Sequence, residues 1–367
     1  MKYIALALLL TVLFGSKLSA KIIVDFSNLD VTDIVSIISR DESRIADAVI
    51  ISHPFKKPGG ERDRGLLVYD YWDTGEKWQR GVDRTIFGRL SDFKRLVDNL
   101  RAKNIEVYCL VDIFNHSEDF NLEFWHQTDF LSRRYSLPGF RLLNIENPNT
   151  RRRLDTVFTG LREINVDKWV FDLRNIPGNL EKSYAEYVRR GFRNGKLILL
   201  NNPYDRREDV VSSQAFWQLR STNFLMPVAD FSSIDRLAIP EYIHWIESGQ
   251  MSVNNIATMI YILANNRDIV IPAEFLKYGN VVRMLDAVKD ASQLKNYVYD
   301  ETKMFLYSTR FAIGFNFSEE ISVFKTPRLI LSNGRYNSVT GSGVLTVGSD
   351  NNYFFMLPSS VYVWKIN

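Results

Sequence analysis

Apolar runs alternate with amphipathic stretches over roughly the first three hundred residues. Runs rich in β-branched and aromatic residues occur at 21–26, 48–53, 105–114, 166–174 and 196–204. The stretches between several of them place apolar residues at helical spacing. A run that is apolar throughout is typical of a strand buried on both faces, as in a parallel sheet. The alternation therefore predicts repeated βαβ units with right-handed crossovers.

The pattern changes near Tyr307. From there to the end of the chain, short alternating runs are separated by turn signals such as Ser332-Asn-Gly334. A period of two, broken by such turns, is typical of antiparallel sheets packed face to face. We therefore predict a small C-terminal antiparallel β-sandwich. No change in composition marks a linker, and we place the boundary near Met304.

Polar side chains follow the ends of the predicted parallel strands. Asp112, Asn115 and His116 follow one run, and Asp172 lies near the end of the next. Barrels and doubly wound sheets place their sites at the carboxyl ends of such strands. A second interpretation, in which these residues only cap a strand and begin a loop, fits the motif equally well.

Four motifs in series favour a site. The segment 65–76 contains Tyr69-Asp70, the turn 84–88 reads Arg-Thr-Ile-Phe-Gly, a predicted helix follows at 91–103, and Asp112, Asn115 and His116 end the next strand. In order and spacing these motifs resemble the alpha-amylase family, glycoside hydrolase family 13.

This resemblance implies an α/β fold, a TIM-type (β/α)8 barrel followed by a small C-terminal β domain. We expect the barrel over 21–304, with a short excursion at about 117–142, and the β domain over 305–367. The chain between 202 and 224 is too short for a full strand and two helices. We therefore expect one abbreviated barrel unit.

The resemblance also assigns roles to individual residues. The nucleophile that forms the glycosyl-enzyme bond maps to Asp172. The third carboxylate, which stabilises the transition state, maps to Asp230, and Asp268 is a rival placement. The substrate-binding positions map to Tyr69, Asp70, Asp112 and His116.

The chain departs from the family's pattern at the proton donor. The strand whose tip carries the acid/base Glu in the family ends here in Asn201 and Asn202. An amide has no proton at a usable pKa, so neither residue can act as a general acid. The Arg two residues before the nucleophile is replaced by Val170, and on the Asp230 alignment the family's His is replaced by Ala229.

Asn115 is the position at which many members of the family bind calcium. Its partner ligands are not identifiable in the sequence. We expect no organic cofactor, and calcium at Asn115 stays open.

The first twenty residues are typical of a cleaved export signal. Lys2 precedes an apolar run that is short for a membrane span, and Ser16, Ser19 and Ala20 suit signal peptidase. No cysteine lies near the cleavage site, so we expect no lipid anchor, no other membrane anchor after cleavage, and a periplasmic or extracellular location. Without Lys2 and Lys17, the 46 basic residues become 44, against 43 acidic residues. This balance gives no reason to expect nucleic acid as a partner.

Two functions of different classes remain open. The first is an exported, non-catalytic member of the family that binds a glycan, such as an α-glucan, or a protein through the barrel mouth. The second is a divergent α-glycosidase or transglycosylase with Asp172 as nucleophile, in which Glu208 or Glu118 supplies the proton. The lost acid, Arg and His positions motivate the first.

Overall fold

The computed structural model describes most of the chain in separate ranges. These are residues 20–39, 46–55, 68, 71, 87–117, 125–136, 139–192, 197–200, 210–212, 243–245, 253–264, 268–289, 295–299, 302–325, 334–340, 344–347 and 353–366.

Eight parallel strands close into a barrel, in the spatial order β1-β10-β9-β8-β7-β6-β3-β2. Every neighbouring pair is parallel, including β1 with β10, which completes the closure. The predicted barrel is therefore confirmed. The strands are β1 (Ile22–Asp25), β2 (Ala48–Ser52), β3 (Glu106–Val111), β6 (Lys168–Asp172), β7 (Leu197–Leu200), β8 (Val210–Ser212), β9 (Ile243–Trp245) and β10 (Ile269–Pro272).

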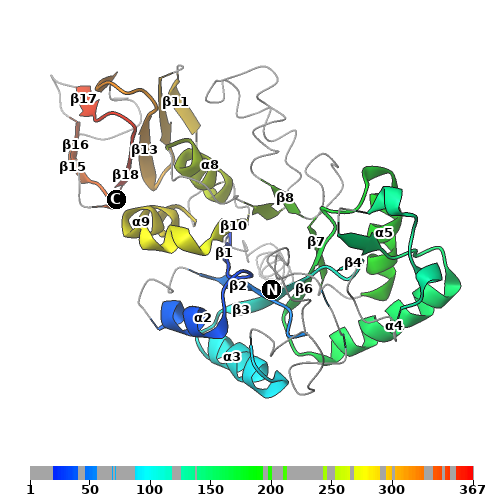
Figure 1. The fold of residues 1–367 in the computed structure, drawn as a ribbon. Helices are drawn as coiled ribbons and strands as arrows, with labels where there is room; N and C mark the ends of the chain where they lie inside the picture. Colours follow the sequence, from blue (N-terminus) through cyan, green and yellow to red (C-terminus); the bar gives the residue numbers. More distant parts are fainter. Residues whose placement is uncertain are drawn as a thin grey trace, which may run out of the picture.

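Helices cover the outside of the barrel (Figure 1). Each of those with described side chains buries one apolar stripe, as α3 does with Phe93, Leu96, Val97 and Leu100. No helix in the described ranges is both long enough and apolar enough to cross a membrane. The helices are α2 (Val31–Ile38), α3 (Leu90–Ala102), α4 (Pro148–Glu163), α5 (Gly178–Gly191), α8 (Val253–Ala264) and α9 (Gly279–Val288).

The connection from β7 to β8 is the abbreviated unit. Only residues 201–209 separate the two strands, which nevertheless pair in parallel. A full crossover with its helix takes at least about 10 to 12 residues. The sequence therefore leaves too little chain here for a complete βαβ unit.

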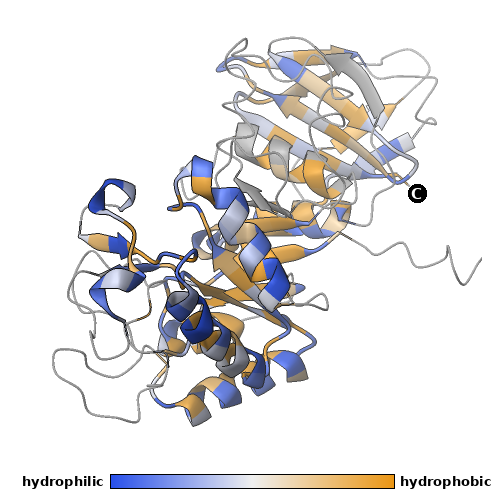
Figure 2. Cartoon of the chain, turned by 90° about the vertical axis from the view of Figure 1, so that its right-hand side faces the viewer, coloured by the Kyte–Doolittle hydropathy of each residue, from blue (hydrophilic) through white to orange (hydrophobic). Residues whose placement is uncertain are grey.

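The barrel interior is apolar in its middle and polar at both ends. Side chains alternate along each strand, so Ile23, Leu110 and Val170 face inward while their neighbours in sequence pack against the helices. Figure 2 shows hydrophobic residues concentrated along the barrel strands, whereas the helices carry both kinds. The inward-facing cluster consists of Ile23, Ala48, Ile50, Tyr108, Leu110, Val170, Ile198, Leu200 and Val270.

The excursion after β3 contains a short hairpin and two 3-10 turns. The strands β4 (Asn115–Ser117) and β5 (Phe140–Leu142) pair antiparallel, and η2 (Gln127–Asp129) and η3 (Arg133–Tyr135) lie between them. Asp129 is buried, forms an ion pair with Arg153 of α4, and accepts a hydrogen bond from Thr150 at 2.9 Å. These contacts hold the excursion against the start of α4.

The C-terminal strands are all paired antiparallel. One sheet has the order β11 (Lys295–Tyr299), β12 (Lys303–Tyr307), β13 (Phe311–Asn316) and β18 (Ser360–Lys365). Two smaller sheets pair β14 (Ser322–Lys325) with β17 (Tyr353–Met356), and β15 (Gly334–Asn337) with β16 (Val344–Val347). The C-terminal sheet thus begins at Lys295, before the boundary placed near Met304.

Helix α8 lies beside the C-terminal sheet (Figure 1), in contact with β13 and β18. Ile313 and Val363 of that sheet belong to the same buried apolar cluster as Ile260 of α8 and Ile271 of the barrel. The barrel and the C-terminal sheet therefore share one core.

Candidate functional site

Three carboxylates lie at the carboxyl ends of barrel strands. Asp25 ends β1, Asp172 ends β6, and Asp112 directly follows β3. Each stands two residues beyond an inward-facing apolar residue, for example Asp172 beyond Val170. Because side chains alternate along a strand, these carboxylates continue the interior rows into the barrel mouth.

Asp172 is held by Arg174, two residues further along the chain. Arg174 Nε donates to Oδ1 of Asp172 at 3.0 Å, and Nη2 donates to Oδ2 at 2.7 Å. The backbone N–H of Arg174 also donates to Oδ1 at 3.0 Å. The Asp172 side chain is 1% exposed and that of Arg174 is 35% exposed. A planar guanidinium that engages both carboxylate oxygens is a strong, geometrically specific pair.

The charge of Arg174 also acts on Asp25. Burial raises the pKa of Asp25, and hydrogen bonds from Ser27 and the charge of Arg174 partly oppose that rise. In the barrel order, β1 and β6 are three strands apart by the shorter way round. The charge of Arg174 therefore acts on carboxylates from two strands that are not neighbours in the barrel.

Asp112 is buried and accepts three hydrogen bonds from its own loop. The donors are the backbone N–H groups of Phe114 and Asn115, both at 3.0 Å, and the side-chain amide of Asn115 at 2.9 Å. Burial, followed by the negative charge of Asp172, raises the pKa of Asp112 to about 7. These hydrogen bonds form an Asx-type turn at the start of the excursion. The Asp112 side chain is 1% exposed.

His116 has no exposed surface. Its Nε2 lies 3.2 Å from the Tyr71 hydroxyl and 3.3 Å from the carbonyl oxygen of Ile113. The rings of Tyr71, Trp125 and Phe130 surround it, at centroid distances of 5.9, 5.5 and 6.3 Å. Burial lowers the pKa of His116 to about 4, so the ring is neutral at pH 7. His116 is packed among aromatic rings, and Asp112 is equally buried. The substrate contacts expected of both residues from the resemblance stay predictions.

Calcium at Asn115 stays a prediction. Asn115 is 2% exposed, and its amide nitrogen is engaged by Asp112. Searched over the described residues, the structure contains no group of three or more His, Cys, Asp or Glu side chains arranged to hold a metal ion.

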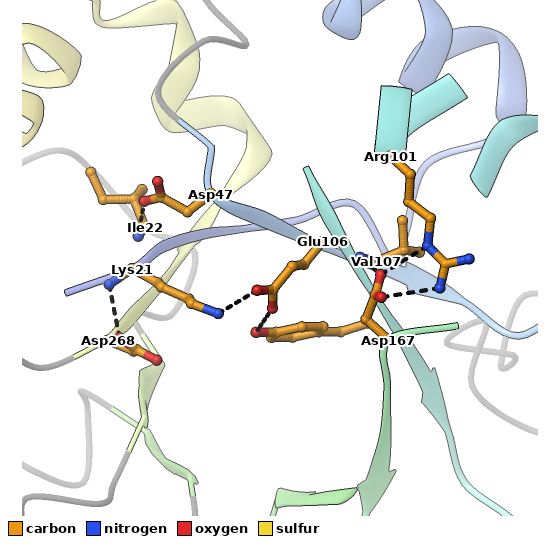
Figure 3. Close-up of polar contacts among 9 residues, drawn as sticks. Lys21, Ile22, Asp47, Arg101, Glu106, Val107, Asp167 and Asp268 are labelled. Atoms are coloured by element: carbon orange, nitrogen blue, oxygen red, sulfur yellow. Dashed lines mark hydrogen bonds and ion pairs between the residues drawn. The ribbon is translucent and has the colours of Figure 1, made fainter. Parts of the chain in front are cut away.

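The rival placement of the third carboxylate, Asp268, is excluded by strand direction. Asp268 precedes β10 and therefore lies at the amino end of the barrel, where its Oδ1 accepts a hydrogen bond from the backbone N–H of Lys21 at 2.8 Å. Figure 3 shows Asp268 beside Lys21 at this amino end, which we call the floor of the barrel. A carboxylate on the floor cannot take part in a site at the mouth.

The other placement of the third carboxylate, Asp230, is not tested by the described residues. In chain order, the seventh strand of the closed barrel is β9 (Ile243–Trp245). Asp230 itself lies outside the described residues, as do Tyr69, Asp70, Asn201, Asn202, Glu118 and Glu208. Their roles stay predictions.

The floor of the barrel is a second polar layer (Figure 3). Lys21 Nζ contacts Glu106 at 2.6 Å, and the Tyr108 hydroxyl donates to the other Glu106 oxygen at 2.7 Å. Lys168 lies over the Tyr108 ring at 5.1 Å from its centroid. These pairs close the amino end of the barrel below its apolar middle.

Comparison with solved structures identifies the architecture. An alpha-amylase from Geobacillus thermoleovorans, solved in complex with acarbose, matches with a TM-score of 0.68 at 13% identity, over 94% of this chain and 98% of that one. An Anoxybacillus alpha-amylase matches with a TM-score of 0.67 at 12% identity, over 95% and 98%. The maltogenic alpha-amylase AmyB from Thermotoga neapolitana matches with a TM-score of 0.66 at 14% identity, over 95% and 99%.

This chain has the alpha-amylase fold. The resemblance carried by the four motifs is thereby confirmed at the level of the fold. No protein-family model matches the sequence, and a search of curated proteins finds no match. At this low identity the likeness extends to the architecture alone.

Within the alpha-amylase fold, the sequence suggested one of the contacts at the mouth and missed another. Asp172 ends β6, the fourth barrel strand, as the resemblance implies. Arg174 was one of two arginines, with Arg267, expected to hold Asp172 in a buried polar network at the mouth, and the structure shows that pair. Asp25 was not predicted as part of the mouth, although it ends an apolar run as Asp172 does.

Proposed function

We propose that this chain is an exported, divergent member of the alpha-amylase family that binds an α-glucan at the barrel mouth without hydrolysing it. The observation that carries the proposal is the closed pair between Asp172 and Arg174. Both oxygens of the nucleophile position are engaged by the guanidinium, and the carboxylate is 1% exposed. A nucleophile must instead present a free oxygen to the anomeric carbon.

The proton donor supports the same conclusion. A retaining glycosidase needs an acid about 5 to 5.5 Å from its nucleophile. The sequence offers Asn201 and Asn202 where the family carries that acid. General acid catalysis typically contributes on the order of 100- to 10,000-fold, so its loss removes about 3 to 5 kcal/mol of barrier lowering.

The proposed ligand class is inferred from solved structures that share this fold. One alpha-amylase was solved with acarbose, and a more distant neighbour, AmyP, was solved with maltotriose. Both ligands are of the oligosaccharide class. Within this fold, the mouth of the barrel is where a ligand of that class would sit.

Export is the second part of the proposal. Residues 1–20 have the basic start, apolar run and small residues of a signal peptide. N-terminal sequencing of protein recovered from outside the cytoplasm should begin at Lys21. Retention of the first twenty residues in that protein would contradict export by cleavage.

Two measurements test binding against catalysis. We expect calorimetry to detect binding of a maltooligosaccharide, and Asp25→Ala at the mouth to weaken it. The matched change Lys168→Ala, on the floor, should leave the affinity unchanged.

The catalytic assay uses an aryl α-glucoside with a good leaving group, because such a substrate needs little acid assistance. We expect no turnover above that of the Asp172→Asn variant. Turnover that Asp172→Asn abolishes would replace our proposal with a divergent glycosidase. Absence of any oligosaccharide binding would overturn the glycan-binding role.

A further inference from the structure

The outer face of the β14–β17 pair carries a continuous row of exposed apolar side chains. The register pairs Val323 with Phe355 and Lys325 with Tyr353. Ile321 and Leu357 extend the row by one position beyond the strand ends. The exposed fractions are Ile321 61%, Val323 44%, Tyr353 57%, Phe355 72% and Leu357 59%. We call these five residues the outer patch.

The two strands that carry the outer patch are closely packed on their other face. The opposite face of the same two strands is buried, with the Phe324 and Phe354 rings stacked at a centroid distance of 4.9 Å. Phe354 also meets Trp364 of the four-stranded sheet at 5.2 Å. The outer side chains therefore cannot turn inward, because the positions that face inward are already filled. A contiguous exposed patch of this kind marks an interaction surface.

The charges at the two ends of the outer patch indicate its partner. Glu319 and Glu320 are exposed next to Ile321, and Lys325 is exposed at the opposite end of β14. The acidic pair disfavours an anionic membrane surface. The row consists of apolar side chains and one tyrosine, which offer few hydrogen bonds to a sugar. A row that is acidic at one end and basic at the other is complementary to itself when reversed.

We propose that the outer patch is a homodimer interface, in which two copies of this chain pack β14–β17 face to face about a twofold axis near the Val323–Phe355 pair. That axis reverses the strand direction and places Lys325 of each copy against Glu319 and Glu320 of the other. The row from Ile321 to Lys325 is about 13 Å long, four steps of about 3.3 Å. The two patches together bury on the order of 1,000 Å2, which is the lower limit for a specific interface. The dimer is therefore weak and reversible.

Sedimentation velocity over a concentration series of the mature chain tests the interface. We expect a monomer–dimer equilibrium, with dissociation in the range of about 1 to 100 µM. Phe355→Ser and Val323→Ser should each weaken dimerisation at least about tenfold. Val35→Ser on α2 is the matched control, since Val35 is 46% exposed and Val323 is 44% exposed. It should leave the equilibrium unchanged.

A charge exchange separates specific pairing from general stickiness. Lys325→Glu should weaken the dimer, and Lys325→Glu combined with Glu319→Lys and Glu320→Lys should restore it. A chain that stays monomeric throughout the series, or a dimer unaffected by Phe355→Ser, would overturn the proposal. A monomer that binds neutral phosphatidylcholine vesicles through Phe355 would assign the outer patch to a membrane instead.

The hydrogen bond from Lys21 to Asp268 carries a second, independent inference, which rests on the proposed export. The backbone nitrogen of Lys21 donates to Asp268 Oδ1 at 2.8 Å (Figure 3). Lys21 is also the residue that follows the predicted cleavage site. Cleavage at that bond would convert this nitrogen from a neutral amide into an ammonium group at the same place.

We infer that signal cleavage completes the barrel floor, because the new α-ammonium of Lys21 forms an ion pair with Asp268. Burial raises the pKa of Asp268, which indicates that its ionised form is incompletely compensated in the uncleaved chain. An ammonium donor places a full positive charge beside the carboxylate, so the contact becomes an ion pair as well as a hydrogen bond. The mature chain should therefore be more stable than a chain with the same residues and a blocked N-terminus.

Selective acetylation of the α-amine of the mature chain tests this ion pair. Acetylation should lower the folding equilibrium constant about tenfold in the parent chain and much less in Asp268→Asn. Glu106→Gln is the matched control, because Glu106 contacts the Lys21 side chain and not its backbone nitrogen. It should retain the full acetylation effect.

Equal losses in the parent and in Asp268→Asn would overturn the ion pair. A mature N-terminus at another residue would instead remove the export step on which the inference rests. Neither result bears on the glycan-binding assay, so the failures stay distinguishable.

Discussion

Arg174 donates hydrogen bonds to both carboxylate oxygens of Asp172, from Nε at 3.0 Å and from Nη2 at 2.7 Å. In the family, a positive charge comes to the nucleophile from two residues earlier, a position taken here by the inward-facing, apolar Val170. Here the positive charge comes instead from Arg174, two residues after Asp172. This cation engages both carboxylate oxygens.

Arg174→Ala should destabilise the fold by about 2 to 3 kcal/mol, because it leaves the buried Asp172 without its charge-assisted partner. Urea unfolding measures this change. The control is Arg95→Ala, which breaks an ion pair with Asp92 whose side chains are 74% and 38% exposed. It should cost under about 0.5 kcal/mol. Equal effects of the two variants would argue against a stabilising role for the mouth pair.

Asp112 should make the fold less stable as pH rises. Burial and the charge of Asp172 raise the pKa of Asp112 from 3.8 to about 7, so the folded state favours its protonated form. This contribution is complete below about pH 4 and is lost as pH rises toward 7, with a total on the order of 4 kcal/mol. Asp112→Asn should remove the decline in unfolding free energy between pH 5 and 7, and Asp172→Asn should shift it to lower pH. An unchanged slope in Asp112→Asn would contradict this assignment.

His116 should act in the opposite direction. Burial lowers its pKa from 6.5 to about 4, so the folded state favours the neutral ring. This contribution is complete above about pH 6.5 and is lost as pH falls toward 4, with a total on the order of 3 kcal/mol. His116→Gln should remove the loss on the acid side and expose the decline caused by Asp112. The exposed His126 provides the control, and His126→Gln should leave the profile as it is.

The two glycines at the ends of α5 should respond oppositely to alanine. A Cβ at Gly191 would stand 2.5 Å from Cδ2 of Phe158 on α4, whereas a Cβ at Gly178 would have no atom within 4 Å. Gly191→Ala should therefore destabilise the fold by about 1 to 3 kcal/mol, because the packed ring must move. Gly178→Ala should be neutral or stabilising by up to about 1 kcal/mol. Thermal unfolding of both variants makes the comparison, and equal shifts in melting temperature would contradict the packing argument.

The longer strands of the barrel could be predicted from the sequence. Runs such as 105–114 and 166–174 are long and apolar enough to identify as buried strands, and they contain β3 and β6. The polar residues that follow them mark the mouth correctly, because strand direction places Asp112 and Asp172 at one end. Their burial could not be predicted, since it depends on side chains brought together from separate elements, such as Tyr71 and Trp125 around His116.

Short strands left too weak a signal. β8 (Val210–Ser212) and β9 (Ile243–Trp245) have three residues each, which shows no period. These strands are identified by pairing with neighbours in the closed sheet, and pairing is not written in a local pattern.

The shared core around α8 has a thermodynamic consequence. Met304 and Phe315 of the C-terminal sheet are buried in the same apolar cluster as Leu263 of α8 and Leu285 of α9. Removing either part would expose apolar surface that the other now covers, so a chain cut at residue 304 should aggregate. We therefore expect the whole protein to unfold in one cooperative transition, because the C-terminal strands cover apolar surface of the helices that pack on the barrel.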